Sequence, residues 1–254
     1  MRSMIFGFLA FSCAYAISLI TYWNEDDTNR LSRLFEDVLN TKRDRIDSLH
    51  YAISGLKLLN AAPSATLVEE LCEIAKKADL TVLETLYHAS ALSGDLPNCT
   101  ISKITEAQIN KAAFDQLLEA SMKADDSPNN LAWVYNAAAL LDRPTAAEYF
   151  DKIKNLVSQA NEIDQRFLQF DGGLITTANA LHGILSLAEL QGKLPAVTKD
   201  QMSLFTNYLL SRKRVFTEKS AFFLLSALGT LANNHGFVPV TVSLVDPIMA
   251  DRSK

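Results

Sequence analysis

The chain has 254 residues, of which 48% are hydrophobic and 21% are charged, so it can bury a sizeable core. Its 24 basic and 29 acidic residues give a formal net charge of −5, which provides no basic surface for a phosphate backbone. This composition excludes a disordered acidic tail and argues against nucleic acid as a partner.

The first 16 residues have the pattern of a secretory signal peptide. Arg2 supplies the positive start, residues 5–11 form a short apolar run, and Ala14-Tyr15-Ala16 fits a cleavage site, so we expect cleavage after Ala16. The alternative is an N-terminal membrane anchor, but the apolar run is short and acidic residues follow at 25–27. No other stretch of the sequence is apolar and long enough to cross a bilayer.

Residues 17–235 are predicted to form a helical domain on the lumenal side of the secretory pathway. Five segments are apolar and rich in small residues: 48–59, 85–92, 131–141, 180–190 and 220–231. More amphipathic helices are expected between them, at 67–78, 109–122, 149–160 and 201–210. This alternation predicts an all-α fold, a curved array of α-α hairpins (solenoid-like or toroid-like) with apolar inner helices backed by solvated outer ones.

Several residue pairs predict where helices begin and end. Capping boxes, in which Ser or Thr accepts from a backbone amide and Glu or Gln reaches back, fit Thr66/Glu69, Thr81/Glu84, Thr105/Gln108, Thr145/Glu148 and Thr198/Gln201. Ser127-Pro128 predicts a further start, and Gly192 a stop.

Strand signals hardly appear before residue 237. From Gly236 onward, residues alternate and are rich in valine, which is typical of a β-strand. Residues 236–254 are therefore expected to contain the start of a β region that is cut short by a polar tail.

Cysteine usage points to a disulfide. Cys13 lies in the signal segment, which leaves Cys72 and Cys99, and a pair of cysteines in an oxidising lumen forms a disulfide by default. Two independent buried thiols remain the alternative, because sequence alone does not show that the side chains meet. Asn98-Cys99-Thr100 is the single N-glycosylation sequon, and the cysteine in its middle position makes it a poorer acceptor, so Asn98 is a possible glycosylation site.

The residue types that carry chemistry are not arranged for catalysis. The histidines at 50, 88, 182 and 235 show no metal-ligand spacing, and the first three occupy comparable places in the apolar helices, which favours a structural, hydrogen-bonded role. Glu84 and Glu189 are expected to be surface or capping residues rather than a glycosidase acid pair. Asp171-Gly172-Gly173 is interpreted as a plain turn rather than an anion site. Catalytic, cofactor-binding and metal-binding residues are therefore all predicted as none.

Aromatic residues at helical spacing allow two interpretations. Trp133, Tyr135, Phe222 and Phe223 could line a groove for a glycan or a partner, or they could pack in the core. Core packing is the simpler explanation.

Four stretches resemble the lumenal N-terminal region of the ribophorin II family: residues 49–56, 89–94, 167–178 and 236–240. Their specificity comes from their order and spacing along nearly the whole chain, and Cys72 and Cys99 fall where this family has cysteines. The resemblance implies a non-catalytic subunit of the oligosaccharyltransferase that glycosylates asparagine in the endoplasmic reticulum. Its catalytic residues belong to another subunit, and its partners are the other subunits of the complex.

Members of that family continue into β domains and transmembrane helices that this sequence lacks. Membrane association is therefore expected only through the complex, on the lumenal side. The alternatives are a secreted α-α toroid that binds or hydrolyses glycans, which needs an acid pair or an aromatic cleft near the array axis, and a lumenal adaptor unrelated to glycosylation.

Overall fold

The computed structural model describes residues 23–61, 65–79, 81–96, 99 and 111–233. Within these ranges the chain is mainly helical, as predicted. The helices are α1 (Glu25–Thr41), α2 (Ile46–Leu58), α3 (Ala65–Lys76), α4 (Leu83–Asp95), α6 (Lys111–Ala124), α7 (Pro128–Ala138), α8 (Arg143–Asp151), α9 (Ile153–Val157), α10 (Gly173–Gln191), α11 (Lys199–Ser211) and α12 (Glu218–Ala232), and the strands are β1 (Asn161–Ile163) and β2 (Phe167–Gln169).

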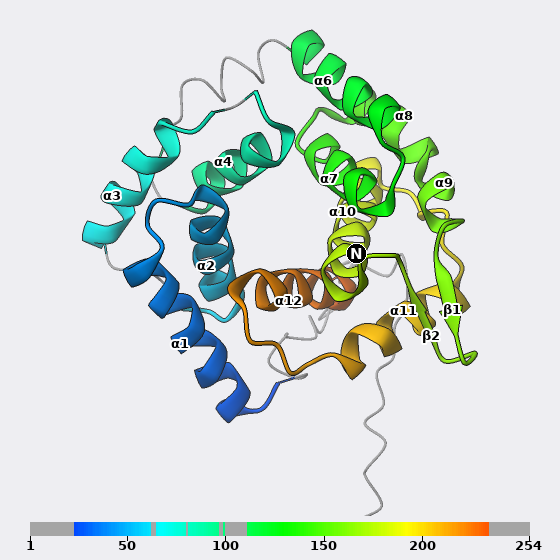
Figure 1. Cartoon of the computed structure of the whole chain (residues 1–254). Helices are drawn as coiled ribbons and strands as arrows, with labels where there is room; N and C mark the ends of the chain where they lie inside the picture. Colours follow the sequence, from blue (N-terminus) through cyan, green and yellow to red (C-terminus); the bar gives the residue numbers. More distant parts are fainter. Residues whose placement is uncertain (1–22, 62–64, 80, 97–98, 100–110, 234–254) are drawn as a thin grey trace, which may run out of the picture.

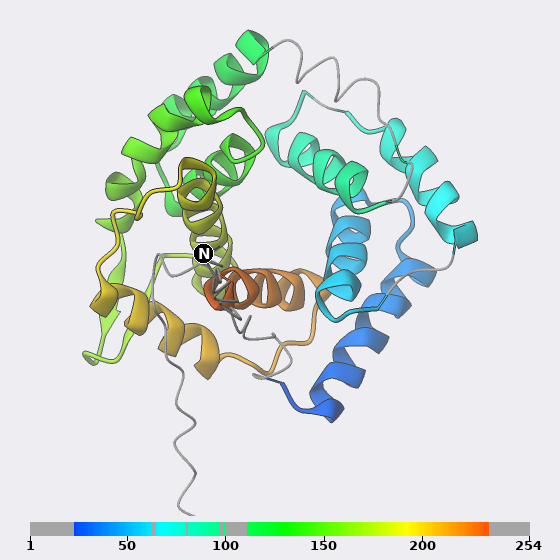
Figure 2. The same cartoon turned by 180° about the vertical axis from the view of Figure 1, so that it is seen from behind.

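The helices form two concentric layers (Figures 1 and 2). The inner layer consists of α2, α4, α7, α10 and α12, and each of these helices packs against the next. Contacts between α12 and α2 close this layer into a ring, and α1, α3, α6, α8, α9 and α11 lie outside it. At the closure, the Glu218 carboxylate accepts hydrogen bonds from Lys42 Nζ (2.6 Å) and Ser48 Oγ (3.2 Å).

Burial follows the composition of each helix. In α2 every residue from Ser48 to Leu56 is buried, as expected for an inner helix that is covered on all sides. In the outer helix α1 the buried residues are Leu31, Phe35, Val38 and Leu39, which recur at the spacing of one helix face. The apolar segments predicted from the sequence therefore became the inner helices, because only a central position covers a helix that is apolar all round.

Two inner-helix glycines allow close packing. A Cβ at Gly55 would lie 2.3 Å from Cζ of the buried Phe35, so α1 approaches α2 over the glycine backbone. A Cβ at Gly183 of α10 would lie 2.8 Å from Nδ2 of Asn136 in α7. That buried amide donates to Ala132 O (2.8 Å), Asn179 O (2.8 Å) and Asn179 Oδ1 (2.9 Å), which ties α7 to α10.

We expect Gly55→Ala to lower the free energy of unfolding by about 1–3 kcal/mol, because the added methyl group overpacks the Phe35 site. Gly94→Ala is the matched control: it is the same change in a helix, but nothing lies within 4 Å of the added Cβ. There, removal of backbone freedom should raise the free energy of unfolding by about 0.5–1 kcal/mol. Urea denaturation of both variants measures the difference, and equal effects would refute the packing argument.

The short hairpin β1–β2 lies in the part of the chain where strand signals hardly appear, so the sequence did not predict it. Its strands pair in antiparallel register, with Glu162 opposite Leu168. β2 packs on α11, and Leu168 of β2 is buried. The single outer helix expected at 149–160 is instead the end of α8, the short helix α9 and a turn that leads to β1.

The predicted helix starts have mixed outcomes. The Thr198/Gln201 capping box and the Ser127-Pro128 start are confirmed. The boxes at Thr81 and Thr145 are wrong: α4 begins after Val82, and Asp142 caps α8. α3 begins at Ala65, close to the start predicted at Thr66, but the side chain of Thr66 lies outside the described part of the chain, as does Thr105.

Thr198→Ala should cost about 1 kcal/mol of unfolding free energy, because it removes the acceptor for the Gln201 amide (3.1 Å) at the start of α11. Thr145→Ala is a suitable comparison, since Asp142 Oδ1 accepts the Thr145 amide at the start of α8 (3.1 Å) and the cap itself remains. A thermal melt of each variant tests this, with a smaller loss expected for Thr145→Ala.

Candidate functional site

The centre of the ring contains two hydrogen-bonded histidines. His50 of α2 and His88 of α4 are 2% and 1% exposed, and their Nδ1 atoms lie 2.7 Å apart. One ring must therefore donate and the other accept. Tyr51 Oη lies 3.4 Å from His88 Nε2. These contacts agree with the structural, hydrogen-bonded role predicted for the histidines.

Aromatic rings surround this pair. Phe222 lies edge-on to His50 with ring centroids 4.7 Å apart, and Trp133 lies edge-on to His88 at 5.2 Å. Phe223 packs against Tyr51 (5.4 Å). Such edge contacts between aromatic rings are favourable beyond the area that they bury. Trp133, Tyr135, Phe222 and Phe223 are all buried, which confirms the core interpretation, and Phe222 in addition borders a cavity.

Burial keeps these histidines neutral. It lowers the pKa of His50 well below 6.5, with further lowering from His88 and His182. The pKa of His88 is also lowered, because burial outweighs the opposing effect of Glu84. His182 of α10 has its pKa lowered to about 4 by burial.

The hydrogen bond of His182 fixes its tautomer. Thr230 Oγ1 donates its proton to Ser226 O (2.8 Å), so His182 Nδ1, which lies 2.8 Å from Thr230 Oγ1, must be the protonated donor. Nε2 of the neutral ring is then an acceptor.

At the N-terminal ends of α4 and α12, a cation lies over the aromatic cluster. Lys219 Nζ is 3.8 Å from Glu84 Oε1 and 6.0 Å from the ring centroids of both Tyr51 and Trp133. Glu84 Oε1 lies 3.7 Å from His88 Nε2, and the pKa of Glu84 is lowered by His88 and Lys219. Glu84 is half-exposed in the first turn of α4, as expected for a surface residue, and Glu189 is exposed.

Towards the C-terminal ends of α2, α4 and α12 lies a cavity of about 550 Å³. Four inner helices line it, and its lining residues are His50, Ser54, Lys57, Leu58, Asn60, Tyr87, Ala91, Asp95, His182, Phe222, Ser226 and Asn233. The sequence did not reveal this cavity, because its residues come from segments far apart in the chain. The sequence feature that comes nearest to indicating the cavity is the recurrence of histidine and aromatic residues in the apolar helices.

The cavity carries one carboxylate, Asp95, among its described lining residues. Asp95 Oδ1 lies 2.5 Å from Lys57 Nζ, and Ser54 Oγ donates to Asp95 Oδ2. A glycosidase needs a second carboxyl group across the bond that it cleaves. Within the described ranges, no three His, Cys, Asp or Glu side chains are placed to hold a metal ion.

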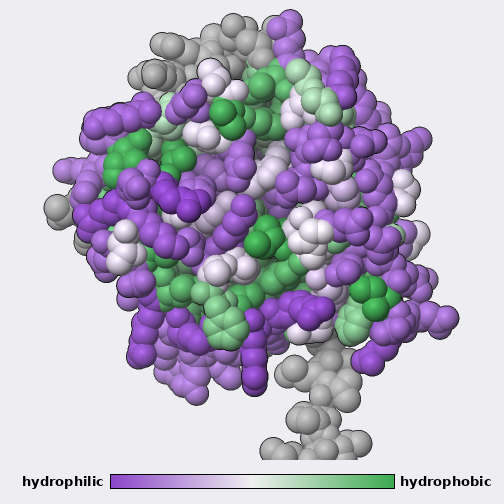
Figure 3. All heavy atoms as spheres, viewed as in Figure 1, coloured by the Kyte–Doolittle hydropathy of each residue, from purple (hydrophilic) through white to green (hydrophobic). Residues whose placement is uncertain are grey.

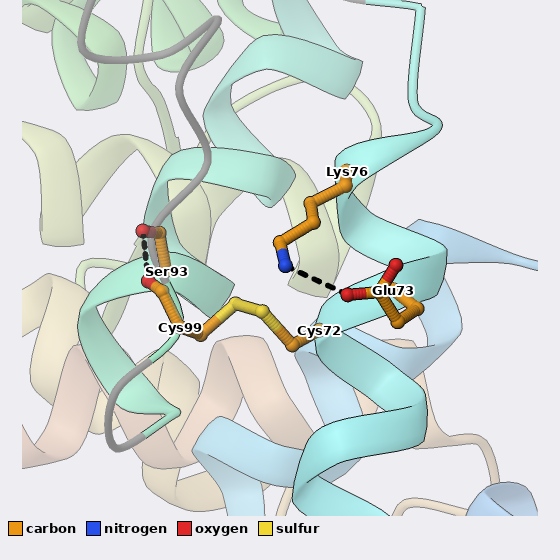
Figure 4. The surroundings of a disulfide bond; sticks show 5 residues. All are labelled: Cys72, Glu73, Lys76, Ser93 and Cys99. Carbon is orange, nitrogen blue, oxygen red and sulfur yellow. Dashed lines mark hydrogen bonds and ion pairs between the residues drawn. A yellow bond between two sulfur atoms is a disulfide. The ribbon is translucent and has the colours of Figure 1, made fainter.

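Cys72 and Cys99 form a disulfide (Figure 4). Their sulfur atoms are 2.12 Å apart and their Cα atoms 5.5 Å apart. The bond connects the outer helix α3 to the chain just after α4, where Ser93 Oγ donates to Cys99 O (2.8 Å). The possible glycosylation site Asn98 and the predicted cleavage site after Ala16 lie outside the described residues.

Asp171 and Gly172 form a turn, as expected. Gly172 and Gly173 have φ values of +94° and +72°, which favour glycine, and Asn161 Nδ2 donates to Asp171 Oδ1 (2.9 Å). The turn thus connects the hairpin to α10.

The molecular surface in the view of Figure 1 is mostly hydrophilic, with small hydrophobic areas between charged side chains (Figure 3). Phe216 (79% exposed) and Leu194 (64%) are the most exposed large hydrophobic residues of the described chain. None of the described helices is long and apolar enough to span a membrane.

This geometry defines a closed double-layered helical ring with a hydrogen-bonded aromatic centre. A family profile described as the Ribophorin II N-terminal domain matches residues 23–113 and 101–232. The chain therefore belongs to the ribophorin II family.

A glycosyltransferase subunit is similar to part of the chain. The dolichyl-diphosphooligosaccharide–protein glycosyltransferase subunit swp1 of Dictyostelium discoideum is 30% identical over 139 residues. The matched region is 50% of this chain and 20% of that relative, so the similarity covers about a fifth of the relative's length.

Proposed function

We propose that the chain is a non-catalytic subunit of the oligosaccharyltransferase complex, which supports protein N-glycosylation in the endoplasmic reticulum. The observation that carries this proposal is the family match, which extends across the whole described ring. The swp1 relative supports it, because its name places that protein in such a glycosyltransferase.

The ring suits a role in assembly. Its inner helices pack against one another and are covered by the outer layer. Outer helices such as α1 keep one solvated face, which other proteins can contact. Among the described residues that line the central cavity there is one carboxylate, Asp95, and it is already paired with Lys57, which supports the non-catalytic role over the glycosidase alternative.

The proposed location is the lumen of the endoplasmic reticulum, with membrane association through the complex. The signal-like segment at 1–16 supports entry into the secretory pathway, and the Cys72–Cys99 disulfide fits an oxidising compartment. The proposed partners are other oligosaccharyltransferase subunits.

Affinity purification from crosslinked microsomes, followed by mass spectrometry, tests the assembly role. The tagged chain should recover oligosaccharyltransferase subunits that an equally tagged, unrelated lumenal protein does not recover. Asp95→Asn is the matched variant: it removes the cavity's carboxylate, so it would abolish a hydrolase activity but should leave the recovered subunits unchanged. Absence of every such subunit from folded, lumenal protein would refute the proposal.

Glycosylation at Asn98 has a separate test. Removal of N-glycans should increase the gel mobility of the wild-type chain and leave Asn98→Gln unchanged, because the chain has a single sequon. Identical mobility of the treated and untreated wild type would show that the site is unoccupied.

A further inference from the structure

The central cavity has a volume within the range of about 300–1,000 Å³ that is typical of small-molecule sites. It lies inside the ring and is lined by α2, α4, α10 and α12, so its walls belong to the most extensively packed part of the fold. A site held by several packed helices is preorganised for a ligand.

The cavity walls carry no net charge. Lys57 and Asp95 form an ion pair with one another, and they are the only permanently charged residues among the described ones that line the cavity. The two histidines of the lining are neutral near pH 7, because burial lowers the pKa of both His50 and His182. A phosphate, a carboxylate or an amine would therefore enter without a compensating charge.

Several buried polar groups of the lining retain unused hydrogen-bonding capacity. His50 is 2% exposed and uses Nδ1 for His88, and within the described chain its Nε2 has no hydrogen-bond partner. The Tyr87 hydroxyl likewise has no hydrogen-bond partner within the described chain. His182 offers Nε2 as an acceptor, because its Nδ1 carries the proton. Ser226 adds a hydroxyl at the same wall. These groups can both donate and accept.

Apolar ring surface lies beside these polar groups. Phe222 and Tyr87 line the cavity together with Ala91 and Leu58. A ligand that fits this lining must offer hydroxyl groups to the polar atoms and C–H surfaces to the aromatic rings, without carrying charge. Sugars have this combination of groups.

We infer that the central cavity is a binding site for an uncharged carbohydrate of one or two sugar rings. The site is independent of the assembly role proposed above, since it uses the inside of the ring rather than the outer helices. Asp95 and Lys57 accept and donate to sugar hydroxyls at one side, and Tyr87 and Phe222 contact the sugar ring.

Saturation-transfer NMR and calorimetric titration of the whole purified chain test this inference. The probes are glucose, mannose, galactose, N-acetylglucosamine, maltose and cellobiose, with glucuronate and glucosamine as the charged counterparts. At least one neutral sugar should bind more tightly than both charged sugars. The inference is overturned if none of the neutral sugars binds, or if a charged sugar binds more tightly.

Ala91→Trp locates the site, because the larger side chain fills the cavity without removing a polar group. Sugar affinity should fall at least tenfold. Ala120→Trp is the matched control, since Ala120 lines a different groove between α4, α6 and α7. If Ala91→Trp does not fold, Ala91→Leu provides a smaller obstruction, with an expected loss of a few fold. Unchanged affinity in a folded Ala91 variant, or an equal loss in Ala120→Trp, would overturn the assignment.

Discussion

Acidification from pH 6.5 to pH 4 is expected to lower the free energy of unfolding by about 3 kcal/mol through His182 alone. The pKa of this residue is about 4 in the folded chain, whereas a histidine in an unfolded chain titrates near 6.5. Between these values the unfolded state binds a proton that the folded state does not, so stability falls by about 1.4 kcal/mol per pH unit. The contribution of His182 is complete above about pH 6.5.

The other central histidines act in the same direction. The pKa values of His50 and His88 are also lowered, so each adds to the loss below pH 6.5. Glu84 acts at lower pH, because its pKa is lowered from the ordinary carboxyl value and its stabilising effect is lost when it is protonated. Urea denaturation at a series of pH values from about 7.5 to about 4 measures the total slope of the free energy of unfolding against pH.

His182→Asn isolates the contribution of one residue. The amide of asparagine can take the place of Nδ1 and donate to Thr230 Oγ1, but it does not titrate. The slope of stability against pH should therefore be smaller than that of the wild type by about 1.4 kcal/mol per pH unit. A wild-type stability that is constant between pH 6.5 and pH 5 would show that these histidines are not held neutral.

The sequence predicts the two layers because composition determines where a helix can be buried. Segments that are apolar on all sides, such as residues 48–59 and 220–231, cannot be solvated on any face, and they became α2 and α12. The closure of the ring was not predictable in the same way. It depends on contacts such as Ser48 with Glu218, which are separated by 170 positions and have no local signal.

The hairpin escaped prediction because its turn has an unusual sequence. Asp164 and Gln165 have φ values of +52° and +54°, a conformation for which Asn-Gly or Asp-Gly is the usual signal. Each strand is also only three residues long. Packing of β2 on α11 therefore decides the local structure, with Phe170 against Phe205 at 5.2 Å.

The central site was predictable in its residue types but not in its geometry. Comparable positions of His50, His88 and His182 in the apolar helices indicated buried, hydrogen-bonded rings. The direct contact between His50 and His88 and the different partner of His182 depend on how neighbouring helices are rotated in the ring. The cavity depends on the same rotations, so no spacing in the sequence reports it.

Removal of the disulfide should cost about 3–4 kcal/mol of unfolding free energy. The bond closes a loop of 27 positions, and in the chain-entropy model the loss of that constraint makes the unfolded state more favourable by this amount. Cys72→Ala/Cys99→Ala is the appropriate variant, because both residues are buried and alanine introduces no unpaired hydroxyl group. Urea denaturation of the variant and of the wild type gives the difference.

A reducing agent provides the control for this variant. It should destabilise the wild type by a similar amount and leave the double variant unchanged. Equal stability of the oxidised and reduced wild type would contradict the prediction.

The location of the disulfide also predicts which helix loses the most protection from hydrogen exchange when the bond is removed. α3 packs on α4 and α2 through Val68, Leu71 and Ala75, whereas the inner helix α10 is covered by both α7 and α12. Without the disulfide, α3 retains only this one buried face, so its local opening should become easier than global unfolding. Hydrogen exchange should therefore accelerate more in α3 than in α10, and an equal acceleration in both would show that the disulfide acts only through the unfolded state.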